Sequence, residues 1–289
     1  SSTSLALGSA AGSLLTDTEL DQISTTGIIT IGQAMTAGTN GASLAAVQTL
    51  TSGAITTDGL TQSNLNLVSN STVSLGTTTL TGNLSVTSAG VITQTGALAI
   101  TGTTTLAAGA ANDITLSTAT NNFTGAVTIT TGKDVTLVDA DTIDLGASTV
   151  SGDFAVTATA GGDITDSGVL AITGNSTFTT AGAQSITLNS ASTYTGTVAF
   201  VASAGTLTNV TINDSGVFDL AALTLTGDLT VTAGGAISDS GTLVVPGTTT
   251  IVAGANNVVL DDAANNFGIV AVTSAGTATL VDVGAIDLG

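Results

Sequence analysis

The chain has 289 residues and a formal net charge of −19, with one basic side chain against 20 Asp and Glu residues. So acidic a chain lacks the cations that neutralise nucleic-acid phosphates or bind an anionic membrane surface, and we expect neither partner. Because Cys and His are absent, disulfide frameworks, thiol nucleophiles, zinc sites and Ser-His-Asp triads are excluded.

Residues 1–31 form the first distinct segment, which we interpret as an N-terminal cap or lead-in. Thr16 is a candidate helix N-cap and Glu19 stands three residues later, as in a capping box. One interpretation is a helical turn within 13–23 that blocks edge pairing of the first strand. The other is a short irregular lead-in, and the sequence leaves both open.

Residues 32–80 contain strand-like pieces, with alternating apolar and polar residues at 65–68. Alternation with period 2 is typical of a half-buried strand. The segment repeats less regularly than the chain after it, so we interpret it as divergent coils of the same solenoid.

From residue 81 onward, a small polar residue, a glycine and an alternating strand recur to the end of the chain. This sequence motif is clearest at 81–87, 151–157 and 226–232. The glycines that mark its copies lie 20 to 31 residues apart and are Gly82, Gly102, Gly125, Gly152, Gly174, Gly196, Gly227, Gly247 and Gly268. A repeat of this length is typical of one coil of a solenoid.

The distance from each glycine predicts which side chains point inward. Four residues after the glycine, the residue is bulky and apolar in every copy, as at Val156, Phe178 and Phe200. Six residues after it, the residue is small, as at Ala158. Because side chains alternate along a strand, these positions share one face. We therefore expect a half-buried strand that stacks on its equivalents in adjacent coils.

The residue type two positions after the glycine repeats every three coils. This pattern defines a super-repeat of about 72 residues. We place the super-repeats at 81–150, 151–225 and 226–289. Low-complexity disorder is the alternative, but disordered tracts do not keep an apolar residue at one offset through successive copies. These features predict an all-β, parallel β-solenoid with about 20–23 residues per coil.

The last two residues are equivalent to Leu145 and Gly146, which lie inside a super-repeat, and no polar capping segment follows them. An uncovered sheet edge is a template for pairing with another chain. The chain is therefore either a fragment of a longer array or a subunit that docks head to tail on the next one. Such docking gives an open filament, so we expect self-association.

Aspartates cluster at the predicted turns, and carboxylate oxygens are ligands that calcium prefers. The weak calcium candidates are Asp139, Asp141, Asp163, Asp166, Asp261 and Asp262. Turn aspartates more often accept hydrogen bonds from nearby backbone. We favour that interpretation, and hence no cofactor, while calcium stays open.

Paired carboxylates such as Asp139 and Asp141 can cleave glycosides. Enzymes of that kind also bring basic and aromatic side chains to their groove, and this chain has one Tyr and no Trp. We therefore expect no enzymatic activity and no catalytic residue. Outward Thr pairs suggest ice binding as a further alternative, but the Thr rows are interrupted at Ala199 and Val201, and Thr is a common exposed strand residue.

The sequence segments at 20–32, 82–90 and 131–138 resemble segments of large bacterial exoproteins of the filamentous-haemagglutinin type. The resemblance implies a right-handed parallel β-helix on the bacterial surface, often adhesive. The Asn-Pro motifs of that family's secretion domain are absent, and an Arg-Gly-Asp motif is impossible without Arg. The resemblance therefore implies neither that secretion route nor integrin-like recognition.

These observations together predict a secreted or cell-surface protein that is structural or adhesive, such as a rod or a filament subunit. The alternative is a surface module that binds calcium or carbohydrate, with surface glycans as partners. No apolar run reaches the roughly 18 residues of a membrane span, so we expect no transmembrane segment.

Overall fold

The computed structural model describes residues 3–8, 29–31, 52–58, 60–62 and 64–289, and side chains from residue 64 onward. The described residues form a parallel β-solenoid of about 10 turns with about 21 residues per turn, which confirms the predicted fold class. Their regular structure is all β-strand. The segment 13–23, where the sequence leaves a helical cap open, lies outside the described residues. The chain divides into two compact units, 1–139 and 140–289.

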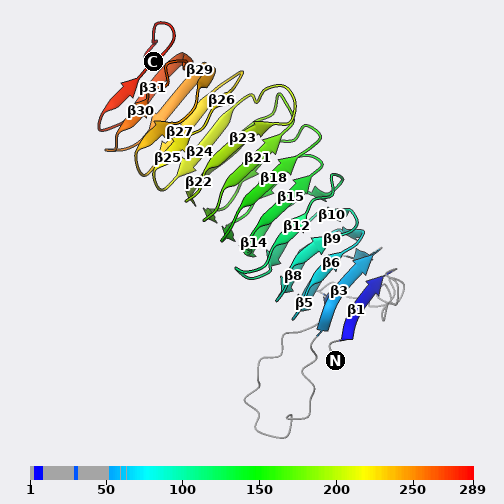
Figure 1. The fold of residues 1–289 in the computed structure, drawn as a ribbon. Helices are drawn as coiled ribbons and strands as arrows, with labels where there is room; N and C mark the ends of the chain where they lie inside the picture. The colour runs from blue at the N-terminus through cyan, green and yellow to red at the C-terminus, as the bar shows by residue number, and fades with distance from the viewer. Residues whose placement is uncertain (1–2, 9–28, 32–51, 59, 63) are drawn as a thin grey trace, which may run out of the picture. The chain divides into compact units, whose positions relative to one another are not determined.

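Three parallel sheets build the first unit, and each turn of the chain adds a strand to each sheet (Figure 1). One sheet contains β1 (Thr3–Gly8), β3 (Ser52–Asp58), β6 (Val73–Leu75), β9 (Ile92–Gln94), β12 (Ile114–Leu116) and β15 (Val135–Asp139). The next contains β2 (Ile29–Ile31), β5 (Leu65–Ser69), β8 (Leu84–Ser88), β11 (Thr104–Ala107) and β14 (Val127–Thr131). The last contains β4 (Leu60–Gln62), β7 (Thr78–Leu80), β10 (Leu98–Ile100) and β13 (Asn122–Phe123).

The apolar side chains of the first unit form rows that run from turn to turn. In one such row Leu67 pairs with Val86, Val86 with Leu106, and Leu106 with Ile129. All four side chains are at most 1% exposed. Burying an aliphatic side chain of this size stabilises a fold by about 2 kcal/mol. Val86, Leu106 and Ile129 join this row because each lies four residues after a marker glycine, an offset that points into the core.

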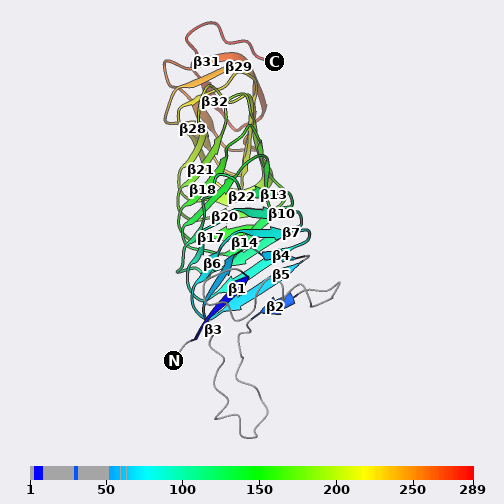
Figure 2. The same ribbon diagram turned by 90° about the vertical axis from the view of Figure 1, so that its right-hand side faces the viewer.

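The second unit also consists of parallel sheets, which follow one another around each turn (Figure 2). The first contains β18 (Phe154–Ala158), β21 (Ser176–Thr180) and β23 (Val198–Ala202). The second contains β16 (Ile143–Leu145), β19 (Ile164–Asp166), β22 (Ile186–Tyr194), β24 (Val210–Asp214), β27 (Leu229–Ala233), β29 (Leu243–Val252) and β31 (Asn266–Ser274), and β26 (Leu223–Thr224) pairs with β29. Beside it, β17 (Ser148–Val150) pairs with β20 (Leu170–Ile172), and β20 with the end of β22. A separate sheet contains β25 (Phe218–Leu220), β28 (Ile237–Asp239), β30 (Val258–Leu260) and β32 (Ala278–Leu280).

The predicted stacking of bulky residues is confirmed in β18, β21 and β23. Val156 pairs with Phe178, and Phe178 pairs with Phe200. The rings of Phe178 and Phe200 are stacked with centroids 6.2 Å apart, and Phe154 meets Phe178 edge-on at 6.0 Å. Phe200 is only half-buried, because β23 is the last strand of this sheet.

A super-repeat is longer than three turns. Equivalent strands of successive super-repeats therefore join different sheets. The interval from Gly174 to Gly196 spans 22 residues and holds β21 and the two halves of β22, whereas that from Gly196 to Gly227 spans 31 residues and holds four strands, β23 to β26. The extra strand shifts the next super-repeat by one sheet. Consequently β27, which begins the third super-repeat, pairs with β24 and not with the sheet of β23.

The recurring glycine is required where successive turns approach most closely. The backbone N–H of Gly174 donates to the carbonyl oxygen of Gly152 at 2.9 Å. A Cβ atom on Gly174 would lie 2.4 Å from the carbonyl carbon of Gly152, which real side chains do not tolerate. The turn therefore needs a residue without a side chain.

Candidate functional site

A buried polar cap closes the four-stranded sheet of the first unit at β13. The Asn121 Oδ1 atom accepts a hydrogen bond from the backbone N–H of Leu98 at 2.9 Å, and the Asp139 Oδ2 atom accepts one from that of Phe123 at 2.8 Å. Both polar side chains are fully buried. Asn121 supplies an acceptor to β10 just before β13 begins, and Asp139 supplies one to β13, the last strand of the sheet. These acceptors are needed because buried backbone N–H groups must be paired.

The same cap recurs twice in the second unit. Ser192 Oγ accepts from Leu170 N at 2.9 Å and Asp214 Oδ1 from Tyr194 N at 3.5 Å, while Asn265 Oδ1 accepts from Leu243 N at 2.8 Å and Asp282 Oδ1 from Phe267 N at 2.8 Å. Asp139, Asp214 and Asp282 are thus equivalent. The calcium candidate Asp139 is a backbone acceptor, and the other two are not among the calcium candidates.

The calcium candidate Asp166 is also a backbone acceptor. Its Oδ1 atom accepts from the N–H of Asn189 at 2.8 Å, and its Oδ2 atom from that of Ser190 at 3.2 Å. The side chain is 9% exposed, and burial raises the pKa of its carboxyl group above the ordinary Asp value. Asp239, its equivalent in the third super-repeat, accepts from the N–H of Asp261 at 2.9 Å.

The other candidates are similarly placed at turns. Asp163 Oδ1 accepts from the N–H of Ser185 at 2.8 Å, and Asp262 Oδ1 accepts from that of Ala264 at 2.9 Å. Asp141 and Asp261 are exposed. Within the described ranges, no three acidic side chains converge as a metal site would require. Calcium binding stays a prediction.

Lys133, the chain's single basic residue, pairs with two carboxylates. Its ammonium group donates to Asp134 and lies 3.7 Å from Asp113. The hydrogen bond with Asp134 and the charge of Asp113 raise the pKa of Lys133. The cation therefore belongs to a local pair at the turn between β14 and β15.

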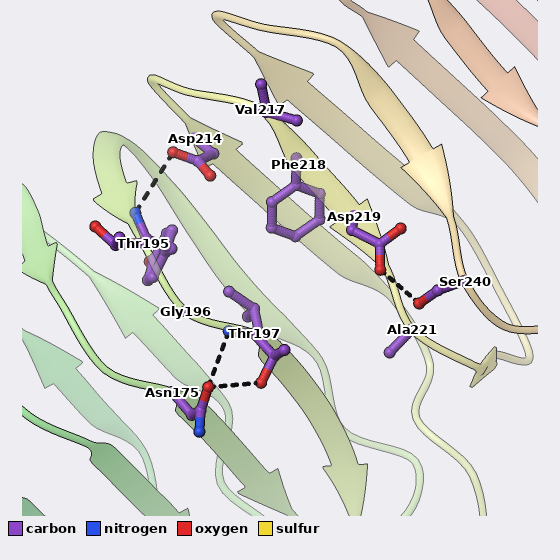
Figure 3. A pocket seen from close by; sticks show the side chains of 12 residues that line it. Asn175, Thr195, Gly196, Thr197, Asp214, Val217, Phe218, Asp219, Ala221 and Ser240 are labelled. Atoms are coloured by element: carbon purple, nitrogen blue, oxygen red, sulfur yellow. Dashed lines mark hydrogen bonds between the residues drawn. The ribbon is translucent and has the colours of Figure 1, made fainter.

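A pocket of about 360 Å³ lies in the second unit between the end of β22 and β25 (Figure 3). These two strands belong to different sheets. The residues that line it include Asp214, Tyr194, Phe218, Asp219 and Ser240. The volume is within the range of small-molecule sites, which starts at about 300 Å³.

Two buried polar atoms beside this pocket have no hydrogen-bond partner. One is Asp214 Oδ2, and the other is the hydroxyl oxygen of Tyr194. Asp214 is 1% exposed, and burial raises the pKa of its carboxyl group. The Asp214 Oδ1 atom is already used, since it accepts from Tyr194 N and, at 3.0 Å, from Gly216 N. Burial also raises the pKa of Tyr194.

The local sequence pattern does not predict this pocket, although one feature of the sequence points to it. The 31-residue interval between Gly196 and Gly227 is the longest between marker glycines. It contains the extra strand that displaces the next super-repeat by one sheet. A break between β22 and β25 follows from that displacement, and the pocket occupies the break.

A family of repeats of unknown function, DUF5649, matches residues 62–130, 132–201 and 207–274. The chain belongs to this family. The matched segments recur at about the spacing of the super-repeats, which supports the long period found in the sequence. No curated protein and no solved structure matches the chain. The described residues include no helix that could span a membrane.

Proposed function

We propose that this repeat protein is a structural or adhesive β-solenoid of the bacterial surface and that it assembles head to tail into filaments. The observation that supports the proposal best is the recurrence of one polar cap in all three super-repeats, at Asp139, Asp214 and Asp282, of which the first two are buried. Side chains that are chemically suited to binding or catalysis are used here to hold successive turns together. Such use of carboxylates favours a scaffold over an enzyme.

The similarity of several sequence segments to filamentous-haemagglutinin-type exoproteins supports the surface location. The composition supports it as well, because a chain with one basic residue offers trypsin-like proteases a single cleavage site. The parallel sheets support the mode of assembly, since a terminal strand of a parallel stack can pair with a strand of the next subunit.

Electron microscopy and sedimentation of the purified protein across a range of concentration and salt test this proposal. The net charge of −19 makes subunits repel one another, and salt screens that repulsion because the Debye length falls to about 3 Å at 1 M. We therefore expect fibres one solenoid wide that lengthen with protein concentration and with salt. A protein that stays monomeric throughout contradicts filament assembly.

Melting experiments with and without calcium separate the scaffold from the alternative calcium-binding module. The candidate carboxylates accept backbone hydrogen bonds, so we expect calcium to act as an ordinary screening ion. Magnesium at equal concentration is the control. A rise in Tm specific to calcium, in a protein that remains monomeric, favours the binding module instead.

A further inference from the structure

The break between β22 and β25 leaves a strand edge facing the pocket. The backbone N–H of Phe218 donates to Ala236 at 2.9 Å, on the side of β28. The opposite edge of β25 faces the pocket, and no ladder joins it to β22. This is a place where the fold itself provides no neighbour.

The wall of the pocket includes Asp214, which has an acceptor atom that the protein does not use. Asp214 Oδ2 is buried without a hydrogen bond, and so is the Tyr194 hydroxyl. An unpaired buried polar atom destabilises the protein, and more so if it is charged. A ligand that donates a hydrogen bond or a positive charge at this point removes that cost. A ligand of negative charge is excluded by Asp214 and Asp219 together.

The protein has no cation of its own for this position. Lys133 is its one basic side chain, and it is paired with Asp113 and Asp134. Asp219, the other carboxylate of the pocket, is already hydrogen-bonded by the hydroxyl groups of Ser238 and Ser240. The buried carboxylate oxygen of the pocket that has no hydrogen bond is therefore Asp214 Oδ2, in a chain whose net charge attracts basic partners.

We propose that this pocket binds the side-chain ammonium group of a lysine from a partner protein. A single free carboxylate oxygen suits a compact ammonium donor, whereas the guanidinium fork of arginine pairs best with both oxygens of one carboxylate. The walls suit the aliphatic part of the side chain, because Val198, Val217 and Phe218 line the pocket. Lysine buries its methylene stem along such surface while its charge is paired.

The partner is a different protein. A second copy of this chain offers only Lys133, which already has two carboxylate partners. The site therefore gives the proposed adhesive role a recognition chemistry, and it rests on that role only for its biological use. Binding of a lysine side chain at the pocket does not require filaments.

The test is a titration of the whole protein, followed by NMR at near-neutral pH and physiological salt, with N-acetyl-lysine N-methylamide as probe. We expect weak, saturable binding that shifts the Asp214 carboxyl and Tyr194 ring signals. Asp214→Asn should weaken it at least about tenfold, because the charge-assisted hydrogen bond is lost. Asp282→Asn is the matched control, since Asp282 has the equivalent cap position outside the pocket, and it should leave affinity within about twofold.

Three further probes decide the chemistry. The arginine analogue should bind at least about fivefold more weakly than the lysine analogue, and the norleucine analogue, which has the stem without the charge, should not bind. Methyl glucoside should not compete. If Asp214→Asn does not fold, Ala221→Leu, at an exposed pocket residue, provides the second variant and should block binding.

Several results overturn the inference. They are no binding of the lysine analogue, equal weakening by Asp214→Asn and Asp282→Asn, equal binding of the norleucine analogue, or displacement by the sugar. Fibres that form without lysine binding refute the pocket assignment alone. Lysine binding without fibres refutes filament assembly alone.

Discussion

A buried hydroxyl group without a hydrogen-bond partner occupies the same place in each super-repeat, at Thr104, Ser176 and Thr249. All three side chains are at most 1% exposed. They are the polar members of the three-coil cycle two residues after the marker glycine, where the neighbouring coils carry Leu, Phe or Val. Their position in an apolar row costs stability without any compensating hydrogen bond.

Replacing Thr249 by Val should therefore stabilise the protein by about 1 kcal/mol, because the shape is kept and the unpaired hydroxyl is removed. Thr250→Val is the control, since the neighbouring side chain points outward and is half-buried. Urea denaturation followed by circular dichroism measures both. A Thr249→Val protein less stable than the parent refutes the assignment of an unpaired hydroxyl.

The two buried aspartates of the second unit make a testable contribution to pH dependence. Burial raises the pKa values of Asp166 and Asp214 above the ordinary 3.8. The folded protein thus binds these protons more tightly than the unfolded chain does. Their contribution to the free energy of unfolding is most favourable at low pH and falls as pH rises from 3.8 through the raised native values.

Asp214→Asn should flatten the decline of Tm with pH between about pH 4 and 7, since the amide does not titrate there. Asp282→Asn removes the same formal charge and serves as the control for general repulsion. Thermal melts in a series of buffers measure the slopes. Equal slopes for the parent and Asp214→Asn count against a raised Asp214 pKa.

At the scale of the strand and its turn, the close stacking of glycines is the main constraint. Marker glycines of successive turns are joined by backbone hydrogen bonds, as from the N–H of Gly174 to the carbonyl oxygen of Gly152 at 2.9 Å. The distance leaves no room for a methyl group. The turn therefore requires a residue without a side chain at this position, in addition to its hydrogen bonds.

Gly174→Ala should lower the free energy of unfolding by at least about 2 kcal/mol, because a backbone shift must accommodate the added methyl group. Gly216→Ala is the matched control. A Cβ there meets nothing closer than the Asp214 side chain at 3.7 Å, so the change should stay within about 0.5 kcal/mol. Similar losses for both variants refute the stacking constraint.

For the molecule as a whole, repetition makes stability local. In a solenoid each turn contacts its neighbours in the stack, so unfolding free energy is distributed over nearest-neighbour interfaces. Lys133 lies six residues before the end of the first unit at Asp139, and its N–H donates to the carbonyl of Asn112 at 2.8 Å. One turn thus contains the chain's single tryptic site.

Trypsin should cut this protein once, giving 1–133 and 134–289, and the native rate should report opening of that turn alone. We expect cleavage at least about 100-fold slower in buffer than in urea, because a paired backbone must open first. Gel analysis over time measures the rate, and Lys133→Gln should abolish it. Fast native cleavage contradicts a closed turn at Lys133.

Much of this fold follows from the sequence, because alternation and offset are local properties. The inward rows through Val86, Val156 and Phe178 lie as the offsets predict. The stacking partner of a strand depends instead on how many strands each interval contains, which is a non-local property. The spacing of glycines alone therefore predicts one coil for the 31-residue interval after Gly196, and it predicts neither the change of sheet nor the pocket beside Asp214.

The solitary lysine has a practical consequence. Lys133 is 49% exposed and carries the only side-chain amine in the protein. Once the α-amine is blocked, an amine-reactive linker can couple every molecule to a bead or cantilever through one turn of the first unit. Mechanical measurements on this protein can therefore start from a single, defined attachment point without engineered cysteines.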